Sequence, residues 1–202
     1  MSTPADAAPR HRVRRWLAER GLRQWWKAGV AAILAVAALF GGLDTVNTAV
    51  TSVPPGQPFS DGAFTVTVQR ATVVPEVRGG GSVLAPQKPG RRYLGVVATV
   101  RNDGTVPWTL ANELDLRGQP DQQFVGVMRV ADGSRILTLG PGLTEQLAFV
   151  WEVPETALAP GDPVTLRIWK KQFQQGYVVY GELWVDSLTE YGEIVIPVGG
   201  GS

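Results

Sequence analysis

The chain has 202 residues, no cysteine, a single histidine (His11) and a formal net charge of +1 at pH 7. A sequence without cysteine holds no disulfide, no thiol nucleophile and no zinc–thiolate site. Because the one histidine stands at position 11, a Ser-His-Asp triad, a histidine general base and a histidine-ligated metal are all excluded from the rest of the chain.

The first feature along the chain is a strongly basic segment, which we predict as a cytoplasmic tail over residues 1–24. Up to Lys27 there are seven cations against two anions, a net charge of +5, whereas the remainder carries twelve cations against sixteen anions, a net charge of −4. Positive charge clustered in a short flank stays on the cytoplasmic side of a membrane. We therefore expect a single-pass protein of the cell membrane with its N-terminus in the cytoplasm and its C-terminal part outside.

A charge-free apolar run over residues 28–43 follows, and Trp25 and Trp26 extend it backwards. As a helix, residues 25–43 would span about 28 Å, close to the ~30 Å of bilayer hydrocarbon. We predict a transmembrane helix over 25–43 whose partner is the lipid bilayer. Basic and aromatic side chains at headgroup level would hold its cytoplasmic end: Arg14, Arg15, Arg20, Arg23, Trp25, Trp26 and Lys27.

Other interpretations of this region stay open. A cleaved signal peptide would need a small-x-small site, and the best candidate, at residues 47–49, has Asn47 at its first position. A twin-arginine signal at Arg14 and Arg15 would lie far upstream of the apolar run. A buried helix of a soluble domain would show polar residues at a 3.6-residue period, and this run shows none. The cations have no nucleic-acid-binding motif around them, so we expect no nucleic acid as partner.

Residues 44–61 contain Pro54, Pro55, Gly56 and Pro58 and predict a semi-stiff stalk. Residues 62–198 then predict an all-β domain outside the membrane. Apolar and polar residues alternate over 64–69, and the almost wholly apolar run over 92–101 predicts a central strand. Between them, residues 75–90 predict a long loop, and residues 199–202 a flexible tail. Further strands are expected at 114–116, 123–130, 145–153, 164–169, 177–183 and 193–198. About seven to nine strands without a helical pattern are typical of a β-sandwich.

Three segments carry a resemblance: Tyr93-Leu94-Gly95-Val96-Val97-Ala98-Thr99-Val100-Arg101-Asn102-Asp103-Gly104, then Leu139-Gly140-Pro141-Gly142, then Phe149-Val150-Trp151-Glu152-Val153-Pro154. They resemble the bacterial immunoglobulin-like extracytoplasmic domains of unknown function, which are similar to a secreted mycobacterial immunoprotective antigen. The resemblance implies an immunoglobulin-like sandwich in which Asn102 and Gly104 form the turn after the central strand. It implies no catalytic residue.

Aromatic residues concentrate near the C-terminus and suggest a partner-binding patch, because tryptophan and tyrosine are enriched at interfaces. The alternative is that they alternate along strands as ordinary core. The six are Trp169, Phe173, Tyr177, Tyr180, Trp184 and Tyr191.

Two groups of charged residues have weaker functional interpretations. Glu113, Asp115 and Asp121 could serve a calcium ion or a carboxylate pair, but they lack the dense acidic spacing of a calcium loop, so we interpret them as solvated turn charges. Lys170 and Lys171, with Arg167, could meet anionic wall polymers or simply alternate along a strand edge.

These features predict a non-enzymatic protein whose external domain binds a membrane or envelope protein, with a cell-wall polymer as a further possible partner. We expect no catalytic residue, cofactor or metal. One alternative is an accessory subunit of a multispan complex, docked through the small residues of its membrane helix. Another is an enzyme that acts on glycans through carboxylates such as Glu113 and Asp115.

Overall fold

The computed structural model describes residues 49–175 and 182–200, and every regular element in these ranges is a β-strand. The described residues belong to one compact unit. The strands are β1 (Ala49–Ser52), β2 (Pro58–Ser60), β3 (Phe64–Val74), β4 (Val77–Gly79), β5 (Ser82–Ala85), β6 (Arg91–Asn102), β7 (Trp108–Thr109), β8 (Asp115–Arg117), β9 (Gln123–Arg129), β10 (Arg135–Ile136), β11 (Thr138–Leu139), β12 (Thr144–Pro154), β13 (Pro163–Gln175) and β14 (Glu182–Gly200). The structure therefore confirms the all-β prediction.

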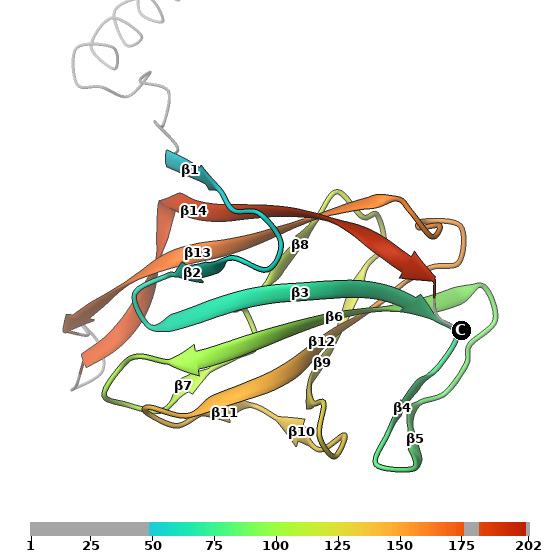
Figure 1. Cartoon of the computed structure of the whole chain (residues 1–202), viewed down its shortest axis with the longest axis horizontal. Helices are drawn as coiled ribbons and strands as arrows, with labels where there is room; N and C mark the ends of the chain where they lie inside the picture. Colours follow the sequence, from blue (N-terminus) through green and yellow to red (C-terminus); the bar gives the residue numbers. More distant parts are fainter. Residues whose placement is uncertain (1–48, 176–181, 201–202) are drawn as a thin grey trace, which may run out of the picture. The chain divides into compact units, whose positions relative to one another are not determined.

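The strands form a sandwich of two layers joined by β14 (Figure 1). One layer has the order β10-β9-β12-β6-β3, with β2 beside β3, and the other has the order β14-β13-β8, with β1 beside β14. The far end of β14 pairs in parallel with β3, so that Val198 faces Ala71. The hydrogen-bonded strand order thus runs from β10 to β8, and these two end strands do not pair with each other. Among the described strands, β8 pairs with β13 alone.

The core lies between the two layers. It is built by side chains of strands in which buried and more exposed residues alternate. Val96, Ala98 and Val100 of β6 are fully buried and share one cluster with Leu166 and Ile168 of β13. Burial of such side chains contributes about 1.5–3 kcal/mol each. The central position of β6, between β12 and β3, agrees with the unbroken apolar run of its sequence.

Two bulges change which face a strand presents to the core. In β3 the register shifts between Val68 and Arg70, so burial passes from even-numbered to odd-numbered residues. In β13 a shift between Trp169 and Lys171 does the same: burial at Ile168 would continue at Lys170, but Lys171 is the buried residue. One extra residue inverts the alternation of everything beyond it.

The structure departs from the expected stalk, from the expected long loop and from the expected number of strands. The expected stalk over 44–61 belongs to the sandwich from residue 49 onwards: β1 pairs with β14, β2 pairs with β3, and Phe59 is buried. The expected loop over 75–90 contains the β4–β5 hairpin, which covers part of the outer face of the sheet. The described residues form fourteen strand segments instead of the expected seven to nine, because most pieces of two to four residues are too short to show a period-2 pattern.

Within the described ranges no helix is long and apolar enough to cross a membrane. The predicted membrane anchor over 25–43 and its basic flank lie outside the described residues. The same is true of residues 177–181, the first part of the strand expected over 177–183.

Candidate functional site

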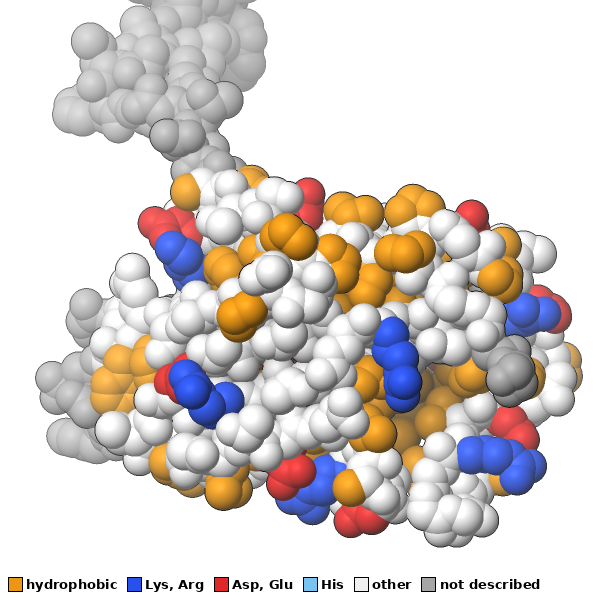
Figure 2. Space-filling view, in the orientation of Figure 1, with side chains coloured by type: hydrophobic (Ala, Val, Ile, Leu, Met, Phe, Trp, Pro, Cys, Tyr) orange, Lys and Arg blue, Asp and Glu red, His pale blue; other side chains and the backbone are white. Residues whose placement is uncertain are grey.

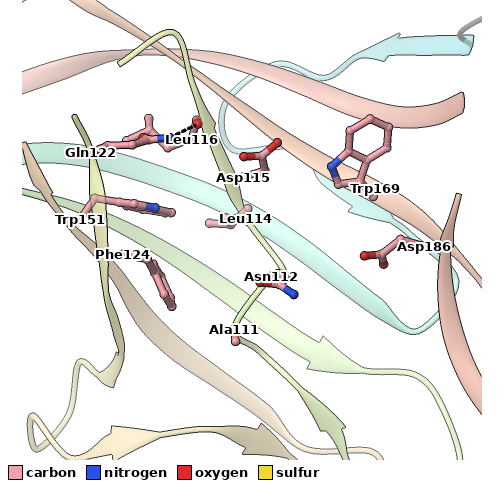
Figure 3. A pocket seen from close by; sticks show the side chains of 10 residues that line it. All are labelled: Ala111, Asn112, Leu114, Asp115, Leu116, Gln122, Phe124, Trp151, Trp169 and Asp186. Atoms are coloured by element: carbon pink, nitrogen blue, oxygen red, sulfur yellow. Dashed lines mark hydrogen bonds between the residues drawn. The ribbon is translucent and has the colours of Figure 1, made fainter. Parts of the chain in front are cut away.

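A groove of about 420 Å³ lies where the sandwich stays open, beside the edge strand β8 (Figure 3). Its lining comes from the segment that leads into β8, from β8 itself, from Gln122 just before β9, and from single residues of β9, β12, β13 and β14. Small-molecule sites in proteins commonly measure about 300–1,000 Å³, so the groove has the size of a ligand site. Its lining residues are Ala111, Asn112, Leu114, Asp115, Leu116, Gln122, Phe124, Trp151, Trp169 and Asp186.

Aromatic rings stand on both sides of the groove. Figure 3 shows Phe124 and Trp151 on one side of the 111–116 segment, and Trp169 with Asp186 on the other. Trp151 is buried and its ring centroid lies 5.5 Å from that of Phe124, which is 38% exposed. Trp169 packs edge-on against Tyr191, with ring centroids 4.9 Å apart. Supported rings of this kind offer a rigid apolar surface at little entropic cost.

A second, smaller cavity of about 110 Å³ adjoins the groove, because Asn112 and Asp186 line both. The rest of its lining is Trp108, Thr109, Glu113, Lys171 and Trp184. We call it the side cavity.

A buried ion cluster forms one wall of the side cavity. The Lys171 Nζ donates to Asp61 Oδ2 at 2.5 Å and to Glu113 Oε2 at 2.9 Å, and it lies 3.8 Å from Asp186 Oδ1. Asp61, Glu113 and Lys171 are each less than 10% exposed. Burial alone would lower the pKa of Lys171, but the two carboxylates next to it raise the pKa above 10.5. Lys171 therefore stays charged.

The two carboxyl groups of this cluster differ in the number of hydrogen bonds that they accept. Asp61 Oδ1 also accepts hydrogen bonds from the backbone N–H groups of Ala63 and Phe64, whereas Glu113 receives one hydrogen bond among the described residues. Burial raises the pKa of Glu113 well above its ordinary value of 4.5, against the opposing effect of the Lys171 ammonium. Asp61 is therefore held by three hydrogen-bond donors, whereas Glu113 is the carboxyl group whose pKa burial raises.

Unpartnered polar atoms gather at this site. Among the described residues, three buried side-chain polar atoms have no hydrogen-bond partner: Glu113 Oε1, Gln122 Oε1 and Trp184 Nε1. All three residues line the groove or the side cavity. Gln122 uses its other atom, Nε2, to donate to the Leu116 carbonyl at 2.8 Å across the open edge. Because buried polar groups in folded proteins are nearly always paired, their concentration here singles out this region of the described structure as the candidate site.

The aromatic residues singled out in the sequence fall in different places. Trp169 lines the groove and Trp184 the side cavity, while Phe173 packs on Trp184 with ring centroids 4.9 Å apart. Tyr191 is buried, beneath Trp169 and with the Arg167 guanidinium 4.4 Å from its ring centroid. Tyr177 and Tyr180 lie outside the described residues, as do the predicted membrane-interface residues.

The charged residues depart from the sequence interpretation. Glu113 was expected as a solvated turn charge, and Lys171 either as a contact for anionic wall polymers or as part of a strand edge, but the two side chains are buried against each other. Asp115 lines the groove and forms an ion pair with Arg117 at 3.4 Å. Asp121 lies in the turn before β9 with a positive φ of 51°. Within the described ranges no three acidic or histidine side chains converge in a way that could hold a metal ion.

A larger hollow of about 760 Å³ lies on the outer face of the sheet, beside the β4–β5 hairpin. Figure 2 shows it with hydrophobic side chains on its floor and basic side chains at its rim. Its lining includes Val74, Val77, Val97 and Val150 together with Arg70. None of the three unpartnered buried atoms found in the described residues belongs to its lining, so we regard the groove at the open edge as the candidate site.

The fold is similar to that of an uncharacterized β-sandwich protein from Clostridium difficile 630, with 12% identity and a TM-score of 0.51 over 75% of this chain and 97% of the other. This likeness identifies the class of protein as a β-sandwich. A conserved hypothetical protein from Bacillus anthracis gives a TM-score of 0.35, with 17% identity over 55% of this chain and 85% of the other. No protein-family model matches the chain. No curated protein matches it either.

Proposed function

We propose that the chain is a non-enzymatic, single-span membrane protein whose extracytoplasmic, immunoglobulin-like β-sandwich binds an envelope partner in the groove beside β8. The membrane part of the proposal rests on the sequence, through the basic flank and the apolar run over 25–43. The resemblance to bacterial immunoglobulin-like domains supports the same location.

One observation carries the binding function: the three described residues that have an unpartnered buried polar atom, Glu113, Gln122 and Trp184, all line the groove or its side cavity. A binding site needs polar groups that are held in place and not already satisfied by the protein itself. The Phe124 and Trp169 rings, which are not buried, supply apolar area in the groove.

The test is photocrosslinking in native membranes with a photoreactive phenylalanine at position 124 in the groove. The matched control carries it at position 83 of the β4–β5 hairpin, because Phe124 and Val83 are exposed to similar extents, 38% and 45%. We expect a single crosslinked species from position 124 and none from position 83. Equal crosslinking from both positions would contradict the proposal.

A third variant with the photoreactive group at position 35 tests the alternative of an accessory subunit, which the small residues of the apolar run support. Crosslinks from position 35 to a multispan protein, with none from position 124, would favour docking through the membrane helix and overturn the groove as the functional site.

A further inference from the structure

The groove lies between two strand edges that no described strand covers. On one side, β8 pairs with β13 alone, through Asp115–Arg117. On the other side, β9 pairs with β12 along its length, whereas β10 covers the outer edge of β9 only at Val127 and Met128. Phe124, the residue of β9 that lines the groove, therefore has a free edge among the described strands. An uncovered strand edge is a template for a further strand.

The main chain of Phe124 points to this free edge. The Gln146 C=O accepts from the Val130 N–H, so every second residue of β12 from Gln146 to Glu152 turns its main-chain groups toward β9. Trp151 is not one of them and turns its groups toward β6. Phe124 lies opposite Trp151, and the two residues of such a pair point away from each other. The N–H and C=O of Phe124 therefore face the open edge.

The main chain of β8 faces the same edge, and a side chain bonds to it where a strand would. The Leu116 C=O accepts from Gln122 Nε2 at 2.8 Å, and Gln122 lies just before β9 (Figure 3). The main chain of Leu116 thus points away from β13, toward the groove that both residues line. A side-chain amide has a donor and an acceptor like those of a peptide bond, so Gln122 makes a bond that a strand beside β8 would make.

The charged residues among the described lining of the groove are both acidic, Asp115 and Asp186. Figure 3 shows their carboxylates on the Trp169 side of the groove. The two side chains are 32% and 46% exposed, and the cations near them, Arg117 at 3.4 Å and Lys171 at 3.8 Å, do not belong to the lining. A basic side chain at this end of the groove would meet two carboxylates and the face of a tryptophan ring, whereas an anionic polymer would be repelled.

We propose that the groove binds an extended, basic segment of a partner protein, which adds to the sandwich as a strand and takes the place of the Gln122 side chain at the Leu116 carbonyl. This inference rests on the proposed binding function and names the class of its ligand. The main chains of Phe124 and Leu116 hold the segment, and a lysine or arginine of the segment lies by Asp115 and Asp186. Strand addition of this kind takes its affinity from main-chain hydrogen bonds and its specificity from alternate side chains.

The test titrates a synthetic peptide, acetyl-Thr-Val-Lys-Val-Thr-Val-amide, into the isotopically labelled full chain in detergent micelles. NMR follows the backbone amide of Phe124, whose resonance is identified by its loss from the labelled phenylalanine spectrum of Phe124→Leu. We expect the peptide to shift this resonance in a saturable way and to slow its hydrogen exchange, because the N–H gains an acceptor.

Methylation of the peptide main chain separates strand pairing from apolar contact. N-methylation of the lysine or of the valine after it removes a main-chain donor and keeps every side chain. We expect each of these peptides to bind at least about tenfold more weakly. The control peptide carries the same methyl group on its C-terminal amide and should bind as the parent does. Glutamate in place of the lysine should abolish the shift, because it faces two carboxylates.

Two substitutions in the chain test its own contribution. Gln122→Ala removes the side chain that competes with the segment at the Leu116 carbonyl, so the peptide should bind about fivefold more tightly. Asp186→Asn removes one acidic charge and should weaken binding by about threefold. The matched control is Asp132→Asn, in the turn after β9 and outside the groove lining, which should bind as the wild type does.

The outcomes separate this inference from the proposed function. If the peptide leaves the Phe124 resonance in place, or if the N-methylated peptides bind as tightly as the parent, the groove does not take a strand and the inference is overturned. Crosslinking from position 124 in native membranes can still succeed in that case, and the groove would then bind a partner of another class. If position 124 fails to crosslink, the proposed binding function itself falls.

Discussion

At the scale of single residues, the buried Lys171 and its two carboxyl partners could not be predicted from the sequence. Lys170 and Lys171 are adjacent and chemically identical, and strict alternation from Ile168 would bury Lys170. The bulge between Trp169 and Lys171 buries Lys171 instead. The local sequence has no feature that predicts this bulge. Glu113 was missed for a related reason: its partner lies 58 positions away in the chain.

Replacing Lys171 with methionine should strongly destabilise the domain. The substitution keeps the chain length of the side chain but leaves Asp61 and Glu113 buried without a cation, which costs about 3–5 kcal/mol in comparable proteins. Urea unfolding of the full chain, followed by tryptophan fluorescence, measures the change. The matched control is Lys170→Met, which removes a half-exposed ion pair with Glu190 and should cost less than about 1 kcal/mol. Equal losses in the two variants would contradict the buried cluster.

The raised pKa of Glu113 predicts a specific pH dependence of stability. In the folded chain burial raises the pKa of Glu113, while the unfolded chain releases the proton near pH 4.5. As the pH rises above 4.5, the free energy of unfolding of the wild type should therefore fall relative to that of Glu113→Gln. The relative loss is up to about 1.4 kcal/mol per pH unit and stops once the folded-state pKa is passed. Denaturant titrations of both proteins between pH 4 and pH 8 measure this difference. A difference that stays constant over that range would show that Glu113 is ionised in the folded chain.

At the scale of elements, the long strands could be predicted and the short ones could not. Alternation over 64–69 and the apolar run over 92–101 match β3 and β6, because such patterns follow directly from burial of one or both faces of a strand. The sequence predicts a stalk over residues 44–61 because its prolines disfavour a central strand. The structure accommodates them at the edges instead: β1 pairs only with β14 and β2 only with β3 among the described strands.

The packing of β2 on the sandwich can be tested at Gly192 of β14. A Cβ atom added there would lie 2.9 Å from the ring of Phe59, a buried residue of β2. Gly192→Ala should therefore destabilise the domain by about 1–3 kcal/mol through overpacking. At Gly95 of β6, an added Cβ would meet only the Thr72 carbonyl oxygen at 3.9 Å, so Gly95→Ala is the matched control and should be nearly neutral. If residues 49–61 were a free stalk, the two variants would unfold at the same urea concentration.

At the scale of the whole molecule, the class of fold was predictable and the site was not. Spacing of strands and turns predicts a sandwich without reference to distant contacts. The groove, in contrast, takes residues from β8, β9, β12, β13 and β14 and forms only where the strand path fails to close. Of the six aromatic residues selected from the sequence, Trp169 and Trp184 line the groove or its side cavity, while Phe124 and Trp151 come from strands that gave no such signal.

The most direct test of the central claim, that the groove beside β8 is occupied by a partner in the envelope, is hydroxyl-radical footprinting in native membranes and on the purified chain. Oxidation of Phe124 and Trp169 is compared with that of Leu188, which is 90% exposed and lines neither cavity. We predict that Phe124 and Trp169 are protected in native membranes and become reactive on purification, while Leu188 reacts equally in both. Equal reactivity of all three side chains in the two preparations would contradict the assignment of the groove as the binding site.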